Sequence, residues 1–122
     1  MECKCSITSG DECVCVHVDG EVTLPDAKRI AAAAHAAVQE HACRRILVDA
    51  REAVVRLSLL DLYELGESAS RLMLGAVDGV ALVVPAESLQ PDRFFERVCQ
   101  NRGLKLQVFT DLDEAVQWLK AA

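Results

Sequence analysis

The segment at residues 44–65 decides the fold, and it reads RRILVDAREAVVRLSLLDLYEL. Its first part, residues 44–50, is a short apolar run rich in β-branched side chains, which is typical of a buried strand. Its last part repeats apolar residues at helical spacing and predicts a long helix from about Leu59 to Leu74. A buried strand that leads into a helix is the repeating unit of α/β folds.

The same alternation continues toward the C-terminus. GVALVVP at residues 79–85 and LKLQVF at residues 104–109 predict two further buried strands. A helical apolar stripe over residues 92–102 lies between them, with Gly103 as the expected helix stop. A last helix should begin after Thr110, where the sequence TDLD has the form of a capping box.

The N-terminal third predicts a pair of strands and one helix. Residues 3–8 and 12–19 are the expected strands, joined by a turn at residues 9–11. Valines occupy every second position of the later strand and give it one apolar face. An alanine-rich helix should then begin at Thr23 and fade near His41.

Together these elements predict a single α/β domain over residues 1–122, in the order β-β-α-β-α-β-α-β-α. Five strands form a mainly parallel sheet with right-handed crossovers, and four helices cover it. No linker or low-complexity run divides the sequence. The residues expected in the core of the sheet are Ile46, Leu47, Val48, Val80, Leu82, Val83, Leu106 and Val108.

Composition excludes several classes of function. The formal net charge of the 122 residues is −6, and the 13 Lys and Arg residues are scattered among 19 acids, which argues against a nucleic-acid-binding surface. No apolar run approaches the roughly 20 residues that a membrane span needs. The N-terminal sequence MECKCSITSG lacks the basic and apolar regions of a signal peptide. We therefore expect a cytoplasmic protein.

Three stretches carry a resemblance to a known family: GEVT at residues 20–23, ILVDAR at 46–51, and FFERVCQNRGLKLQVFTDLDEAVQWL at 94–119. With this layout the chain resembles the SpoIIAA-like proteins, small bacterial relatives of the STAS domain of anti-sigma-factor antagonists. The resemblance implies a STAS-like fold and a non-enzymatic module that binds or regulates a protein. The CRAL-TRIO lipid-binding domains share the general architecture, so a small apolar-ligand or lipid-binding domain is the alternative.

Ser58 is the candidate regulatory residue. In regulatory STAS domains a kinase phosphorylates a serine at the start of the helix after the central strand, and counting from Asp49 places Ser58 at that position. The small polar residues that surround the family's serine are replaced here by Leu57, Leu59 and Leu60. Ser58 and Asp61 also form an S-x-x-D capping box, which needs no regulatory role. Helix cap is the favoured interpretation and phospho-acceptor the alternative.

The segment before Ser58 is the candidate partner surface. Loops after strand ends carry sites in parallel α/β folds, and the expected loop at residues 50–57 has an amphipathic sequence. Its candidate contact residues for a protein partner or a second copy of the chain are Arg51, Val54, Val55 and Arg56. The two valines are equally consistent with a short extra strand or with packing under the helix. Asp49 is expected to pair with the following loop or with Arg51.

The six cysteines form no C-x-x-C motif, and in a reducing cytoplasm they are expected to remain thiols. Zinc could use the cysteines at positions 3, 5, 13 and 15 with His17, provided that all face one way. A two-residue turn that pairs Thr8 with Cys13 would place the first two cysteines on the valine face and the last two on the opposite face. That register divides the ligand set, so no metal site is predicted.

No constellation in the sequence points to catalysis. His35 and His41 are six residues apart and fall on different faces of the alanine-rich helix. No Ser/His/Asp set, catalytic carboxylate pair or glycine-rich phosphate loop stands out. We therefore predict a protein that is not an enzyme and that uses no cofactor.

Overall fold

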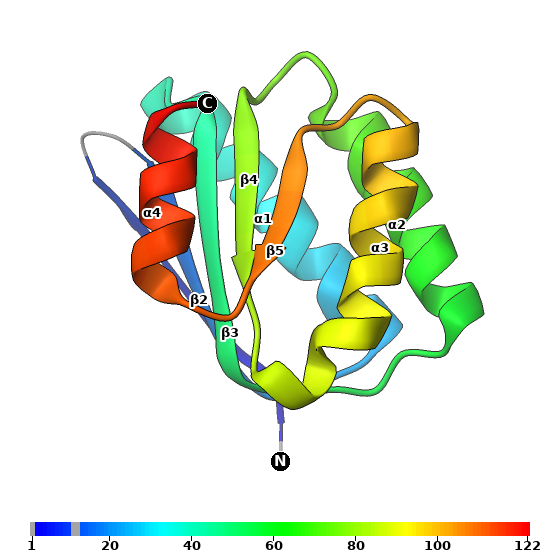
Figure 1. Ribbon diagram of the computed structural model, residues 1–122. Helices are drawn as coiled ribbons and strands as arrows, with labels where there is room; N and C mark the ends of the chain where they lie inside the picture. Colours follow the sequence, from blue (N-terminus) through cyan, green and yellow to red (C-terminus); the bar gives the residue numbers. More distant parts are fainter. Residues whose placement is uncertain (1, 11–12) are drawn as a thin grey trace.

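The computed structural model describes residues 2–10 and 13–122, which form one five-stranded sheet with helices on both faces (Figure 1). The order of strands and α-helices is the predicted one, and a short 3-10 turn, η1 (Ala86–Ser88), precedes the third helix. The strands are β1 (Lys4–Ser9), β2 (Val14–Val22), β3 (Arg45–Val55), β4 (Gly79–Val83) and β5 (Leu106–Phe109). The helices are α1 (Leu24–His41), α2 (Leu59–Met73), α3 (Leu89–Asn101) and α4 (Leu112–Lys120).

The sheet is mixed. Its strands follow in the order β1-β2-β3-β4-β5, and the last four pair in parallel. β1 pairs with β2 in antiparallel fashion, as strands joined by a short connection do. The prediction of a mainly parallel sheet therefore holds for three of the four strand pairs, and the fold as a whole has an antiparallel edge strand.

Helices cover the two faces unequally. The side chains of α1, α2 and α3 share one buried cluster with the valine face of β2, whereas α4 packs alone on the opposite face of the central strands (Figure 1). Phe109 and Trp118 meet on the α4 side, with their ring centroids 5.7 Å apart. α2 packs between α1 and α3. No helix in residues 2–10 and 13–122 is long and apolar enough to cross a membrane.

The central strand β3 is longer than predicted. We expected a strand over residues 44–50 and a loop over residues 50–57, but β3 continues to Val55. The reason is its neighbour: β2 runs on to Val22, and the pairing of Val22 with Val55 satisfies backbone groups that a loop would leave to water. The candidate partner loop is thus mostly a strand, and only residues 56–58 connect it to α2.

The β1–β2 register also differs from the predicted one. Thr8 pairs with Cys15 rather than with Cys13, because β1 continues to Ser9, whose partner is Val14. Asp11 of the predicted turn and Glu12, the first residue of the predicted strand, lie outside the described residues. A shift by two residues leaves the faces unchanged, so Cys3 packs with the valine face while Cys13 and Cys15 pack with the α4 face.

Six of the eight predicted core residues are buried, and two are only partly so. Val48 and Leu82 are the exceptions. Both lie under α2 and line a cavity, which leaves their side chains incompletely covered.

Candidate functional site

Ser58 lies at the N-cap of α2, exposed to solvent, with an extended backbone. Its Oγ accepts a hydrogen bond from the amide of Asp61 at 3.1 Å, and an Oδ2 of Asp61 accepts one from the amide of Ser58 at 3.1 Å. The side chain therefore satisfies a backbone donor that the helix leaves unpaired. The hydroxyl is held in the cap while remaining at the surface.

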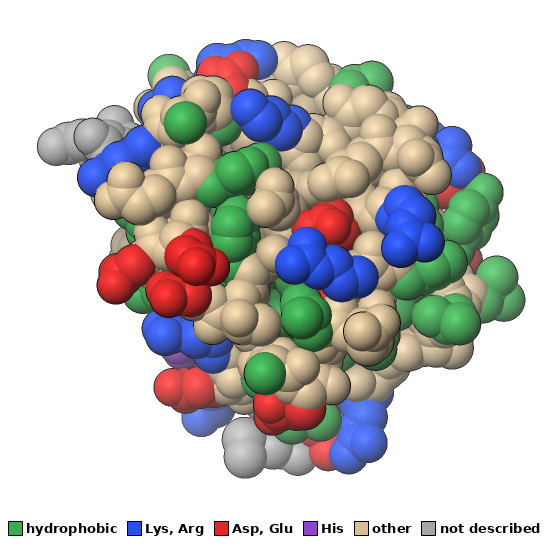
Figure 2. Space-filling view, in the orientation of Figure 1, with side chains coloured by type: hydrophobic (Ala, Val, Ile, Leu, Met, Phe, Trp, Pro, Cys, Tyr) green, Lys and Arg blue, Asp and Glu red, His purple; other side chains and the backbone are tan. Residues whose placement is uncertain are grey.

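Large apolar side chains are exposed immediately after this cap. Leu59, Leu60 and Tyr63 form what we call the α2 patch, and Leu60 is 76% exposed. Hydrophobic side chains gather over α2 at the right edge of the space-filling view (Figure 2). Sequence reasoning assigned the helix a buried stripe and missed this second apolar face. The available signal was the pair of adjacent leucines, since two neighbours in a helix cannot both face the core.

Tyr63 is anchored from the neighbouring helix end. Arg102, just beyond α3, donates from Nη2 to the phenol oxygen at 2.9 Å and places its guanidinium 5.6 Å from the ring centroid. The same Arg102 pairs with Glu67 at 2.8 Å. These contacts hold the Tyr63 side chain in one position. Tyr63 therefore has less conformational entropy to lose when a partner binds the α2 patch.

The four predicted contact residues are divided between different environments. Val54 is exposed, whereas Val55 is partly buried and lines the cavity, as alternate residues of a strand must. Arg56 is exposed, with Nη2 3.6 Å from the Glu21 carboxylate. The structure therefore does not gather the two valines on one surface.

Arg51 makes the expected pair with Asp49. Its Nε and Nη2 donate to the two carboxylate oxygens at 2.9 and 2.8 Å. These hydrogen bonds are the main reason that the pKa of Asp49 lies below its ordinary value. His17 Nδ1 lies 3.8 Å from the same carboxylate. Both carboxylate oxygens of Asp49 accept hydrogen bonds from Arg51, so the two side chains hold each other in place at the surface.

A second polar cluster lies beside it, where the ligand atoms of His17, Asp19 and Glu52 are within 4.8 Å of one another. Imidazole and carboxylate are the donors of many divalent-metal sites. From the sequence we considered His17 only as a zinc ligand together with the cysteines. The pairing of β2 with β3 instead places it near Asp19 and Glu52. The three side chains are at the surface, an environment in which such groups commonly occur with no ion.

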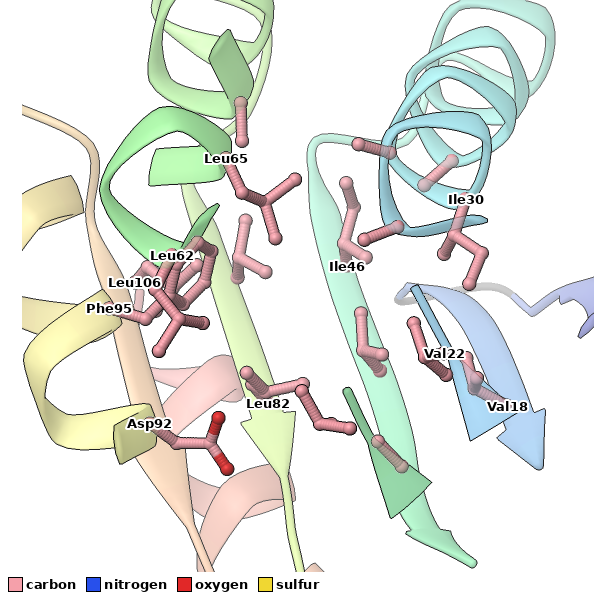
Figure 3. A pocket seen from close by; sticks show the side chains of 18 of the residues that line it. Val18, Val22, Ile30, Ile46, Leu62, Leu65, Leu82, Asp92, Phe95 and Leu106 are labelled. Atoms are coloured by element: carbon pink, nitrogen blue, oxygen red, sulfur yellow. The ribbon is translucent and has the colours of Figure 1, made fainter. Parts of the chain in front are cut away.

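An apolar cavity of about 150 Å³ lies between the sheet and the helices α1, α2 and α3 (Figure 3). Small residues create it: Ala31 and Ala34 of α1 and Ala69 of α2 face the sheet without filling the space. Leucines and valines of the strands and of α2 form the remaining walls. Sequence patterns place these residues in a core but do not show whether their volumes fill it.

One polar side chain enters this cavity. Asp92, in the first turn of α3, is 5% exposed, and its Oδ2 has no hydrogen-bond partner in the described part of the chain. Burial raises the pKa of this carboxyl to about 6. Sequence reasoning missed Asp92, because an acid in the first turn of a helix is ordinary and nothing in the pattern marks it as buried.

The fold and these features define a small α/β domain with one sheet, an exposed helix start and a partly filled core. Residues 13–120 match the SpoIIAA-like family model, so the chain belongs to the SpoIIAA-like family. No curated protein matches the sequence.

Solved structures share the fold at low sequence identity. An anti-sigma factor antagonist from Mycobacterium paratuberculosis is 16% identical with a TM-score of 0.67, over 98% of this chain and 95% of that one. An uncharacterised protein with a SpoIIAA-like fold from Shewanella loihica is 19% identical with a TM-score of 0.57, over 96% and 93%. The anti-sigma factor antagonist SpoIIAA in its unphosphorylated form is 15% identical with a TM-score of 0.59, over 98% and 100%.

Proposed function

We propose that this chain is a non-enzymatic, cytoplasmic regulatory module that binds a protein partner through the α2 patch. The observation that carries the proposal is the exposure of Leu59, Leu60 and Tyr63 in the first two turns of α2. Large apolar side chains grouped at the surface mark interaction sites, and leucine with tyrosine gives the mixture of apolar area and polar handle that interfaces use.

The position of the patch supports the same function. It follows the connection between β3 and α2, at the edge where parallel strands end and where α/β folds carry their sites. Two similar structures are named as anti-sigma factor antagonists, so those proteins act on another protein. Exposed Val54 and Arg56 lie just before the patch in sequence and are the candidates for its rim.

Ser58 serves this surface mainly as a helix cap in our proposal. Its Oγ is already committed to the amide of Asp61, and the apolar neighbours Leu59 and Leu60 are poor surroundings for a phosphate. A phosphate on Ser58 would instead place about two negative charges beside the patch and disturb an apolar contact. Phosphorylation is thus the alternative role, and it predicts that the modified protein releases its partner.

The test compares two exposed leucines at opposite ends of α2. A photo-crosslinking residue at position 60 should capture a partner, or a second copy of the chain, in the native cells, and one at position 74 should not. Leu60→Glu should then weaken the affinity of the purified pair by about tenfold or more. Leu74, 58% exposed at the C-cap, supplies the matched control Leu74→Glu. Equal losses in both variants would contradict a binding site at the α2 patch.

A second candidate function, binding of a small apolar ligand, is favoured by the cavity under α2. A cavity of about 150 Å³ is large enough for a ligand the size of benzene. Native mass spectrometry of protein from its own cells tests this function, because a bound small molecule would add a discrete mass. Ala34→Leu, which points a larger side chain into the cavity, should remove that mass, while Ala33→Leu on the exposed side of α1 should retain it.

A further inference from the structure

The cavity under α2 has a strongly asymmetric lining. Asp92 is its single polar lining residue among those that the structure describes, and every other residue that lines it is apolar. In the close-up, the Asp92 carboxyl points from α3 toward the end of β4, near Leu82 (Figure 3). The site therefore has an apolar interior and one acidic side chain, which suits a small molecule with an apolar body and one polar head group.

Nothing in the described protein neutralises this carboxyl. Its Oδ2 has no hydrogen-bond donor, and no Lys, Arg or His lies within ion-pair distance of it. The neighbouring Arg93 pairs instead with Glu96, at 2.9 Å. Buried polar groups are almost always satisfied, and an exception calls for a missing partner. Burial is the cause of its raised pKa, which agrees with the lack of a nearby positive charge.

We propose that the cavity binds a small alkylamine or arylamine whose ammonium group donates to Asp92 Oδ2 and whose apolar body lies among Leu62, Leu65 and Leu82. This assignment rests on the apolar-ligand function proposed above and names its ligand class. An ammonium brings both the donor and the charge that the carboxylate lacks. A hydroxyl brings the donor alone, and a carboxylate head would repel Asp92 near neutral pH.

The volume of the pocket suits a small ligand. A pocket of about 150 Å³ has room for one ring or a short chain. Leu57 and Val55 also line the cavity, so its wall is continuous with the connection that leads into α2. A bound ligand would therefore contact the connection that contains Ser58, the N-cap of α2, directly before the α2 patch.

Three probes of similar length separate the head groups: hexylamine, 1-hexanol and hexanoate, titrated into the full chain near neutral pH and followed by ¹H–¹⁵N NMR. The proposal expects saturable binding of hexylamine with shifts at cavity-lining residues, weaker binding of hexanol, and no binding of hexanoate. Asp92→Asn should weaken the affinity for hexylamine by about tenfold or more and change the affinity for hexanol little. Ala34→Leu should abolish binding of both, and Ala33→Leu should preserve it.

The outcomes distinguish this assignment from the function on which it rests. If all three probes bind equally and Ala34→Leu blocks them, the cavity is a ligand site and the amine assignment is overturned. If hexylamine binds the Asp92→Asn variant as well as the natural chain, the carboxyl is not the anchor, and the assignment is again overturned. If no probe shifts any cavity residue, both the assignment and the apolar-ligand function are wrong. Far-UV circular dichroism and a melting curve establish that each variant is folded.

Discussion

Ser58 and Asp61 exchange hydrogen bonds across the first turn of α2, each side chain accepting from the other residue's backbone amide at 3.1 Å. Replacing Ser58 with Ala removes one of the two bonds and leaves an amide of the helix unpaired. We expect Ser58→Ala to lower the free energy of unfolding by about 1 kcal/mol, while Ser58→Asp keeps most of it, because Asp also caps and suits the helix dipole. Urea denaturation measures both values.

The control for the cap is Ser68, whose Oγ donates to the carbonyl of Glu64 within the same helix. Ser68→Ala should change the stability by less than about 0.5 kcal/mol. If Ser58→Ala were as stable as the natural chain, the capping role would be wrong. If Ser58→Asp folds normally yet loses a partner that Ser58→Ala binds, Ser58 acts as a switch and the cap-only interpretation fails.

Gly66 sets how closely α2 approaches α3. A Cβ added at Gly66 would lie 2.6 Å from Cγ1 of Val98, well inside contact distance. Alanine favours a helix by about 1 kcal/mol over glycine, but Val98 is buried and stiff at χ1, and overpacking costs about 1–3 kcal/mol. We expect Gly66→Ala to be net destabilising in urea denaturation, despite its better helix propensity.

A double-mutant cycle isolates this contact. Val98→Ala removes the methyl group at 2.6 Å and leaves only the Val98 Cβ, at 3.1 Å, so Gly66→Ala should cost less in the Val98→Ala background than in the natural chain. An unchanged penalty for Gly66→Ala in the Val98→Ala background would mean that the cost comes from elsewhere, and the packing argument would be wrong.

Cys99 should be the least reactive of the six thiols. It is fully buried on α3, and burial raises the pKa of its thiol to about 11. Only the thiolate reacts with iodoacetamide, so both access and ionisation protect Cys99. Mass spectrometry after a brief native alkylation should find Cys5, which is exposed, modified and Cys99 intact. Alkylation of both at the same rate would show that α3 opens readily; full labelling in urea is the control.

The sequence predicted the order of elements because each element has a strong local signal. The alternating valines of β2, the apolar run that begins β3 and the capping box of α2 all depend on residues close together in the chain. The end of β3 was misjudged for the opposite reason. Whether residues 51–55 are strand or loop depends on a partner strand some thirty residues earlier, and a sequence of arginines and valines does not reveal that pairing.

The candidate site was predicted less well than the fold. Ser58 was singled out by its position in the family resemblance, and its capping role was predicted from a local motif. The exposure of Leu60 depends instead on which face of α2 packs against α1 and α3. The presence of the cavity and the burial of Asp92 depend on how the side-chain volumes of three helices and a sheet fill the space between them. Such packing has no periodic signature, so an ordinary first-turn acid gave no sign that it would be buried.

The buried Asp92 carboxyl should make stability depend on pH in a direction opposite to that of most acids. Its folded pKa is raised to about 6, from an ordinary value near about 4. Between these values the native state holds a proton that the unfolded state has released, so stability falls as the pH rises. The penalty is absent below about pH 4 and complete above the folded pKa, where ionisation of Asp92 costs on the order of 1–3 kcal/mol.

Urea denaturation across this range should therefore find Asp92→Asn more stable than the natural chain above the folded pKa, with the difference vanishing on acidification. Asp49→Asn provides the control of opposite sign. Arg51 lowers the pKa of Asp49, so the natural Asp49 stabilises the fold at neutral pH, and that contribution is lost as the pH falls through its folded pKa. Parallel stability curves for Asp92→Asn and the natural chain would show that Asp92 is solvated or paired in solution, which would contradict a buried, unpaired carboxyl.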